Sequence, residues 1–298
     1  MNGSTTGVMP PPITMSRPAL TWWVQISALT FGVAFLYFTI LPRLFYQWMH
    51  DPNYSHGVIV PFFVAWVVWR DRHRLATIES KPSWWGLPVI LASLGILVLG
   101  VLGAENFLSR TSLLFLLGGM IIQFRGWRYF RALLFPWSVL FLAIPVPTLV
   151  FNKIAFPLQF FASRLASGLL GIFGVPVLRE GNVIMLPSIT LDVVEACSGL
   201  RSLVSLITLA VFYGYLFERR TAIRVVLVLS AIPIAVCANG FRIMGSGLLG
   251  EYWSPDKAEG FFHAFSGWLI FVISLFLLIG FHSSLRGAIH WFERRTAA

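Results

Sequence analysis

The sequence is poor in charged residues and in cysteine. Only 11% of its 298 residues are charged and 57% are hydrophobic, whereas a soluble domain carries about 25% charged residues. Mean hydropathy is +0.78, and several apolar runs approach the ~20 residues that cross a bilayer as a helix. This composition excludes a soluble domain and predicts an all-α polytopic membrane protein. Any thiol chemistry is restricted to two positions, Cys197 and Cys237.

Several catalytic signatures are also missing. The sequence contains no H-E-x-x-H motif, no G-x-S-x-G motif and no Walker pattern. Four histidines (His50, His73, His282 and His290) are scattered near proposed membrane boundaries, without the spacing of metal ligands. We therefore expect neither a metal nor a cofactor. No internal repeat is visible, which disfavours a transporter built from inverted repeats.

The net charge of +10 follows the predicted topology of the chain. Most of the 22 Lys and Arg residues lie in alternate loops, where acidic residues are few. The clusters contain Arg70, Arg72, Arg74 and Lys81, then Arg125, Arg128 and Arg131, then Arg219, Arg220 and Arg224, and finally Arg286, Arg294 and Arg295. Basic loops mark the cytoplasmic side of a membrane protein. The charge therefore indicates a lipid bilayer as the partner, and not nucleic acid.

These loops separate eight predicted spans and place both termini in the cytoplasm. The spans are 21–41, 57–69, 86–103, 108–124, 132–147, 197–217, 222–243 and 262–281. About eight transmembrane helices thus make one transmembrane domain, residues 21–285. We expect a disordered cytoplasmic tail at 1–20 and a basic cytoplasmic tail at 286–298.

Two segments on the outer side interrupt this pattern. Residues 151–174 are apolar, but a crossing there would invert all later loops, so we expect an amphipathic helix in the outer interface or dipping partway in. Residues 175–196 alternate polar and apolar around an Arg-Glu-Gly-Asn turn. That pattern predicts a small extracytoplasmic β-hairpin.

The segment "VVEACSGLRSL" places Cys197 in the first turn of the sixth predicted span. A helix N-terminus favours the thiolate. Ser198 and Gly199 would let a substrate carbonyl approach the backbone, and Arg201 would add positive potential, which Glu195 opposes. The alternative is that Cys197 is a small apolar packing residue.

Two further residues reach the same predicted membrane face. Arg242 lies in "NGFRI", inside an apolar run where a charge costs about 2.5–3.5 kcal/mol. His263 lies in "FFHAFSGW", at the outer start of the last predicted span. A cysteine nucleophile, a histidine acid/base and an arginine for the oxyanion are what thiol acyl transfer requires.

For His56 and Asn239, the sequence allows both a functional and a structural interpretation. His56 in "SHG" fits a functional role or a helix-entry turn, and Asn239 fits orientation of Arg242 or a helix–helix hydrogen bond. We interpret Cys237 as a packing residue in apolar surroundings. A disulfide between Cys197 and Cys237 would disable the nucleophile, and we disfavour it.

Four segments, in this order, resemble the exosortases and the related archaeosortases over roughly residues 40–285: "YSHGVIVPFFVAWVVWRDR" (54–72), "VVEACSGLRSL" (193–203), "NGFRI" (239–243) and "FFHAFSGW" (261–268). The resemblance implies a cysteine transpeptidase in the bacterial cytoplasmic membrane, with its active site on the outer face. Its substrates would be membrane-anchored proteins with a PEP-CTERM-type signal, made of a short motif, a transmembrane helix and a basic tail. Cys197, Arg242 and His263 match the catalytic residues of the family.

Two other functions stay open at this point. In a transporter or a lipid-linked exopolysaccharide assembly factor, Arg242 would bind an anionic group. In a serine intramembrane protease, Ser266 or Ser198 would be the nucleophile, although the rhomboid G-x-S-G signature is missing.

The predicted topology can be tested by labelling single cysteines with a membrane-impermeant thiol reagent in intact cells, in a Cys197→Ser/Cys237→Ser background. We expect labelling of cysteines introduced at Glu105, Glu180 and Pro255, and none at Thr77, Tyr129 and Thr221. Labelling at Thr221 would mean that residues 151–174 cross the membrane. Cys197, Arg242 and His263 would then no longer share one predicted face.

Overall fold

The structure is a computed structural model that describes residues 17–193, 199–253 and 261–296, without the side chains of 17–26, 261–264 and 296. The chain divides into two units, residues 1–43 and 44–298. In the first unit, α1 (Arg17–Tyr37) exposes the rings of Phe31 and Phe35, whose centroids are 6.4 Å apart. Such an apolar exposed surface fits a lipid environment. Residues 1–16 of the predicted tail lie outside the described residues, and residues 17–20 belong to α1.

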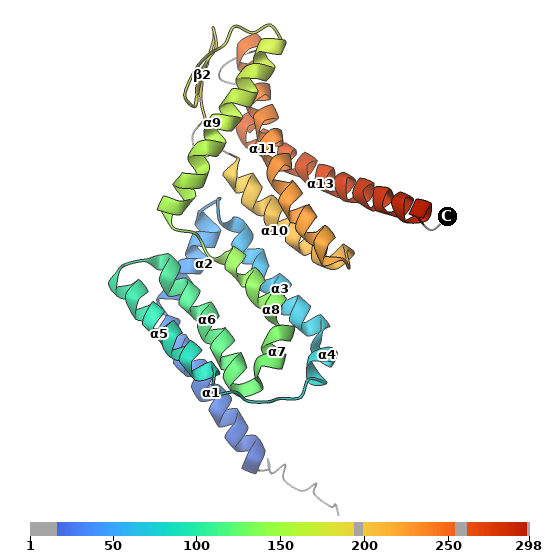
Figure 1. Cartoon of the computed structure of the whole chain (residues 1–298). Coiled ribbons are helices and arrows are strands. Elements are labelled where there is room, and N and C mark those ends of the chain that lie inside the picture. The colour runs from blue at the N-terminus through green and yellow to red at the C-terminus, as the bar shows by residue number, and fades with distance from the viewer. Residues whose placement is uncertain (1–16, 194–198, 254–260, 297–298) are drawn as a thin grey trace, which may run out of the picture. The chain divides into compact units, whose positions relative to one another are not determined.

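The second unit begins within α2 (Ile40–His50). Its first half contains η1 (Ser55–Val58), α3 (Ile59–Arg70), α4 (Arg72–Ala76), α5 (Gly86–Leu102), α6 (Asn106–Arg125), α7 (Trp127–Ala132), α8 (Leu134–Val139) and η2 (Leu140–Ala143). Helices α5 and α6 lie side by side (Figure 1). A Cβ atom on Gly100 would lie 2.5 Å from the backbone N of Ser109. Small residues thus let these two apolar helices pack closely.

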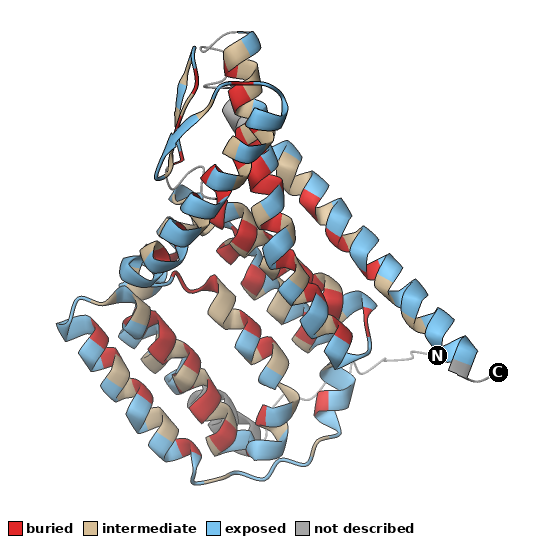
Figure 2. Ribbon diagram, turned by 45° about the horizontal axis from the view of Figure 1, so that its top comes forward, coloured by how far each residue is buried: buried red, intermediate tan, exposed pale blue. Residues whose placement is uncertain are grey.

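The second half of this unit consists of α9 (Thr148–Ile172), a small sheet, α10 (Leu200–Phe217), α11 (Thr221–Tyr252) and α13 (Phe261–Thr296). Helix α11 packs against α9, α10 and α13. Leu206, Leu227 and Leu278, one from each of α10, α11 and α13, are fully buried in their common core. Buried residues concentrate where α10 and α11 face each other (Figure 2).

The sheet confirms the predicted hairpin and adds a third strand. Strands β1 (Leu178–Glu180), β2 (Val183–Met185) and β3 (Thr190–Asp192) are antiparallel in the order β1-β2-β3. Gly181 occupies the β1–β2 turn with φ +64°. The sheet is attached to α9, because Ser163 Oγ donates a hydrogen bond to the Gly181 carbonyl at 3.1 Å.

The prediction of eight spans is not confirmed. In the described part of the chain, four helices (α6, α10, α11 and α13) are long and apolar enough to cross a membrane, or up to six spans if each of two bent helix pairs is one span. Helices α3 and α5, with 12 and 17 residues, are short for a ~30 Å hydrocarbon core. The predicted span 132–147 is interrupted by Pro145 and Pro147, and Leu134–Ala143 bends by 80° into α9.

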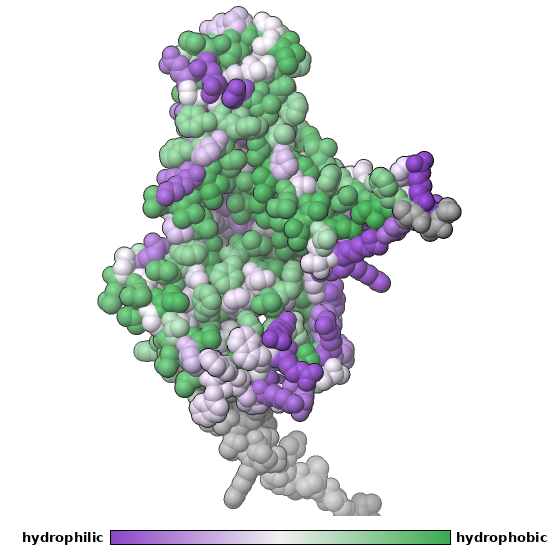
Figure 3. Space-filling view, in the orientation of Figure 1, coloured by the Kyte–Doolittle hydropathy of each residue, from purple (hydrophilic) through white to green (hydrophobic). Residues whose placement is uncertain are grey.

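The helix predicted at 151–174 is present as α9, and its place in the membrane stays a prediction. The expected break before a basic tail at residue 286 is not seen, because α13 continues to Thr296. In the most apolar stretch of α13, only 17% of the residues are buried. Figure 3 shows apolar side chains over this helical surface, with hydrophilic side chains gathered around the sheet and beneath the C-terminal part of α13. The chain is a multi-pass membrane protein.

A buried polar cluster joins α10, α11 and α13 at one end. Oε1 of Glu218 accepts hydrogen bonds from the backbone N atoms of Arg219 and Arg220, at 2.7 and 2.9 Å. Nε2 of His282 lies 3.2 Å from Oε2 of Glu218, and Nδ1 lies 2.9 Å from the Tyr213 hydroxyl. The backbone hydrogen bond from Arg220 is the largest cause that lowers the pKa of Glu218, to about 2. His282 is buried between these helices, and its predicted position at a membrane boundary stays a prediction.

Candidate functional site

The first helical turn of α10 is held against α11. Gly199 caps α10 with φ 74° and ψ 1°, a left-handed conformation that glycine adopts without strain. A Cβ atom at this position would lie 2.7 Å from Cγ of Asn239 and 2.8 Å from its Cβ. The buried Asn239 side chain therefore occupies the space beside the Gly199 backbone. Both predicted roles of Asn239, orientation of Arg242 and a helix–helix hydrogen bond, stay predictions.

Arg242 connects α11 with α13. It lies one turn after Asn239, and its side chain is only 8% exposed. A Cβ atom on Gly267 of α13 would lie 3.5 Å from Nη1 of Arg242. On another side of α11, a Cβ atom on Gly240 would lie 2.5 Å from Cδ2 of Leu165 of α9. Close packing thus holds this turn of α11 against α9, and the buried guanidinium reaches α13 near Gly267.

The side chains of the other two predicted catalytic residues lie outside the described part of the chain. His263 lies in α13 one turn before Gly267, and its side chain is outside the described part. Cys197 lies outside the described residues. In the sequence it precedes Gly199 by two positions. The start of α10, the Asn239–Arg242 turn of α11 and the start of α13 thus come together.

The remaining predicted residues fall into three groups. Glu195 and Ser198 lie outside the described residues. Arg201 is exposed in the first turn of α10. His56 is buried in η1, where Nε2 lies 3.1 Å from the Leu142 carbonyl. His56 therefore supports the chain where η2 ends, which agrees with the interpretation as a residue of a helix-entry turn.

Cys237 differs from its expected role as a packing residue. It is a free and exposed cysteine on α11, and it lines an apolar pocket between α11 and α13 with Phe241, Ile270 and Leu277. Its surroundings are apolar, as predicted, but its side chain faces outward.

The contact between Gly267 and Arg242 was not predicted from the sequence. The glycine one turn after His263 in "HAFSGW" was the available signal, since small residues mark close helix packing. The contact of Leu165 with α11 could not be predicted from the sequence, because one apolar residue on an apolar helix does not stand out from its neighbours.

The contact between Gly199 and Asn239 predicts the effect of an added methyl group. Gly199→Ala combines a left-handed backbone with a clash against Asn239, and should cost about 2 kcal/mol or more of unfolding free energy. Gly168→Ala is the matched control: nothing lies within 4 Å of its Cβ position in α9, so stability should be unchanged or slightly raised. Thermal unfolding of both variants in detergent tests this. Equal melting temperatures would contradict the contact.

Comparisons with known proteins agree with the motif order. The family model of the transmembrane exosortases matches residues 48–280, which include Gly199, Asn239, Arg242 and Gly267. Neither a curated protein nor a solved structure matches the chain. Because the matched range covers well over half of the sequence, the chain belongs to the transmembrane exosortase family.

Proposed function

We propose that this exosortase is a membrane cysteine transpeptidase or peptidase that cleaves C-terminal sorting signals at the outer face of the bacterial cytoplasmic membrane. The observation that carries the proposal is the meeting of three motif segments. Gly199, two residues after Cys197, packs against Asn239, and Arg242 lies beside Gly267, one turn after His263. These segments are far apart in sequence, and they supply the residue types of a thiol acyl-transfer site.

The proposed reaction has two steps. The Cys197 thiolate attacks the carbonyl carbon of the scissile peptide bond, and the Arg242 guanidinium stabilises the oxyanion. The C–N bond then breaks as His263 donates a proton to the leaving amine, which leaves a thioester on Cys197. In the second step, an amine, a hydroxyl group or water attacks the thioester while His263 accepts the proton of the attacking group. The acyl group is transferred and the thiolate is regenerated.

The distance along the helices supports a site at one membrane boundary. From Thr221 to Arg242, α11 rises about 32 Å, and from Gly267 to Arg286, α13 rises about 29 Å. Both lengths match the ~30 Å hydrocarbon core. The arginine-rich ends of these helices are the predicted cytoplasmic ends. The parts of these helices that carry Arg242 and His263, about one hydrocarbon thickness away, would then lie at the outer boundary.

This position suits the proposed substrates. A membrane-anchored protein with a PEP-CTERM-type signal carries its short motif directly before a transmembrane helix, and its basic tail stays in the cytoplasm. The motif therefore reaches the outer boundary, at the depth proposed for Cys197. The substrate helix could approach through the lipid, since α13 is largely exposed there.

The alternative of a transporter or a polysaccharide assembly factor receives less support. A transport site is expected near the middle of broken helices. The three motif segments instead meet near the start of α10 and the start of α13. The family match also favours the peptidase proposal.

The proposal predicts different effects for the two cysteines. Cys197→Ser keeps the size of the side chain but is a far poorer nucleophile without a dedicated base, so the substrate should keep its C-terminal signal. Cys237→Ser is the matched control and should leave cleavage intact. The assay is the gel mobility of a reporter substrate in cells that carry each variant, with enzyme levels checked by blot. Normal cleavage by Cys197→Ala would end the peptidase proposal and favour the assembly-factor alternative.

Arg242 is predicted to act through the planar arrangement of its guanidinium N–H donors, here called the fork, as well as through its charge. Arg242→Lys keeps the charge but loses the fork, and Arg242→Ala loses both. Loss of an oxyanion donor costs on the order of 10²–10³ in rate, and both variants should be badly impaired at normal protein level. Arg164→Lys is the control, because this arginine is exposed on α9. Near-normal processing by Arg242→Ala would identify the residue as a structural arginine only.

A further inference from the structure

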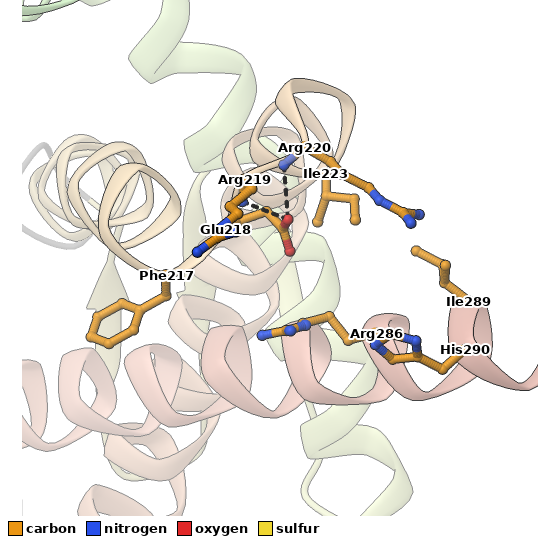
Figure 4. A pocket seen from close by; sticks show the side chains of 8 residues that line it. All are labelled: Phe217, Glu218, Arg219, Arg220, Ile223, Arg286, Ile289 and His290. Atoms are coloured by element: carbon orange, nitrogen blue, oxygen red, sulfur yellow. Dashed lines mark hydrogen bonds between the residues drawn. The ribbon is translucent and has the colours of Figure 1, made fainter.

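A second pocket lies far from the candidate catalytic site, where α10 ends and α11 begins, against the C-terminal part of α13 (Figure 4). Its volume is about 270 Å³. Its basic side chains are Arg219, Arg220, Arg286 and His290, and its apolar walls are Phe217, Ile223 and Ile289. The pocket thus combines positive charge with apolar surface at the end of two candidate spans.

Two of the basic side chains form no salt bridge within the described part of the chain. Arg220 Nη2 lies 2.7 Å from Oε1 of Glu293, and His290 Nδ1 lies 3.5 Å from Oε2 of the same carboxylate. Within the described ranges, by contrast, neither Arg219 nor Arg286 forms an ion pair through its guanidinium group. Figure 4 shows the Arg286 side chain extending from α13 beneath Glu218. Besides the backbone hydrogen bond from Arg220, the charge of Arg286 helps to lower the pKa of Glu218, although Oε1 of Glu218 already accepts two backbone hydrogen bonds. The guanidinium N–H groups of Arg219 and Arg286 are therefore available to hydrogen-bond a ligand.

Glu218 also lines the pocket, and its oxygen atoms are already engaged. Oε1 accepts the backbone hydrogen bonds of Arg219 and Arg220, and Oε2 lies beside His282. The side chain is only 7% exposed. Glu218 therefore fixes the floor of the pocket, while the arginines form its accessible polar surface.

The geometry points to a binding site for the phosphate of an anionic phospholipid. Guanidinium groups bind phosphate oxygens through paired hydrogen bonds, and basic pockets between membrane helices suit lipid headgroups. The apolar walls continue onto lipid-exposed surface, since Phe217 is 61% exposed. A phospholipid would place its phosphate between Arg219 and Arg286 and its acyl chains along α11 and α13. Free phosphate would use only the polar half of the pocket. The site does not depend on the proposed catalytic activity.

The test uses the purified full-length protein and native mass spectrometry. The protein is titrated with dioleoyl phosphatidylglycerol and, separately, with the phosphatidylcholine of the same chains. We expect saturable binding of one phosphatidylglycerol molecule, at least about tenfold tighter than phosphatidylcholine. Arg219→Gln/Arg286→Gln should weaken phosphatidylglycerol binding by about tenfold or more, because charged hydrogen bonds are lost. The single variant Arg286→Gln should show part of this loss, and its exposed position leaves the fold intact.

The matched control removes two charges further along α13. Arg294→Gln/Arg295→Gln has the same net charge as the test variant but lies outside the pocket, so phosphatidylglycerol affinity should change less than twofold. An equal loss in both double variants, or equal binding of the two lipids, would indicate non-specific attraction and overturn the proposal. Displacement of phosphatidylglycerol by millimolar inorganic phosphate would identify a free-anion site and overturn it too.

Discussion

The close contact between the Gly199 backbone and the Asn239 side chain is the constraint on which the candidate site depends. It leaves no room for a Cβ atom on residue 199, and it ties the first turn of α10 to a buried turn of α11. Arg242 follows one turn later and reaches Gly267 of α13. The N-cap of α10 and the Gly267 turn of α13 are thereby both packed against the turn of α11 that carries Asn239 and Arg242. In the proposed function, this turn would supply the cationic neighbour of the Cys197 thiol.

The helices α10, α11 and α13 carry polar groups mainly towards their two ends. At one end, Glu218 is hydrogen-bonded by backbone N–H groups and lies beside the buried His282. At the other, Asn239 and Arg242 are buried among small residues. Between them lies an apolar core that includes the fully buried Leu206 and Leu227. Most buried polar groups of these helices are thus separated by an apolar core, and the Glu218 carboxylate is satisfied by neighbouring backbone N–H groups.

The sequence was sufficient for the class of fold and for the order of the motifs, but not for the continuity of the helices. Strongly apolar runs such as that of α6 were located within two residues, because hydropathy is a dominant signal. The break at Pro145 and Pro147 was missed, since apolar residues on both sides concealed it. The extension of α13 to Thr296 was missed because charged residues at a helix end resemble a soluble tail in sequence. The neighbours of Arg242 depend on packing between distant segments, which no local pattern encodes.

The central claim is that the thiol of Cys197 becomes acylated beside Arg242. Mass spectrometry of the purified enzyme after brief incubation with a substrate peptide in detergent tests this most directly. The account predicts an adduct whose mass equals the N-terminal product fragment less one water, located on the peptide that contains Cys197 and released by neutral hydroxylamine. A substrate that is cleaved without any adduct on Cys197, or with the adduct on Cys237, would contradict the account.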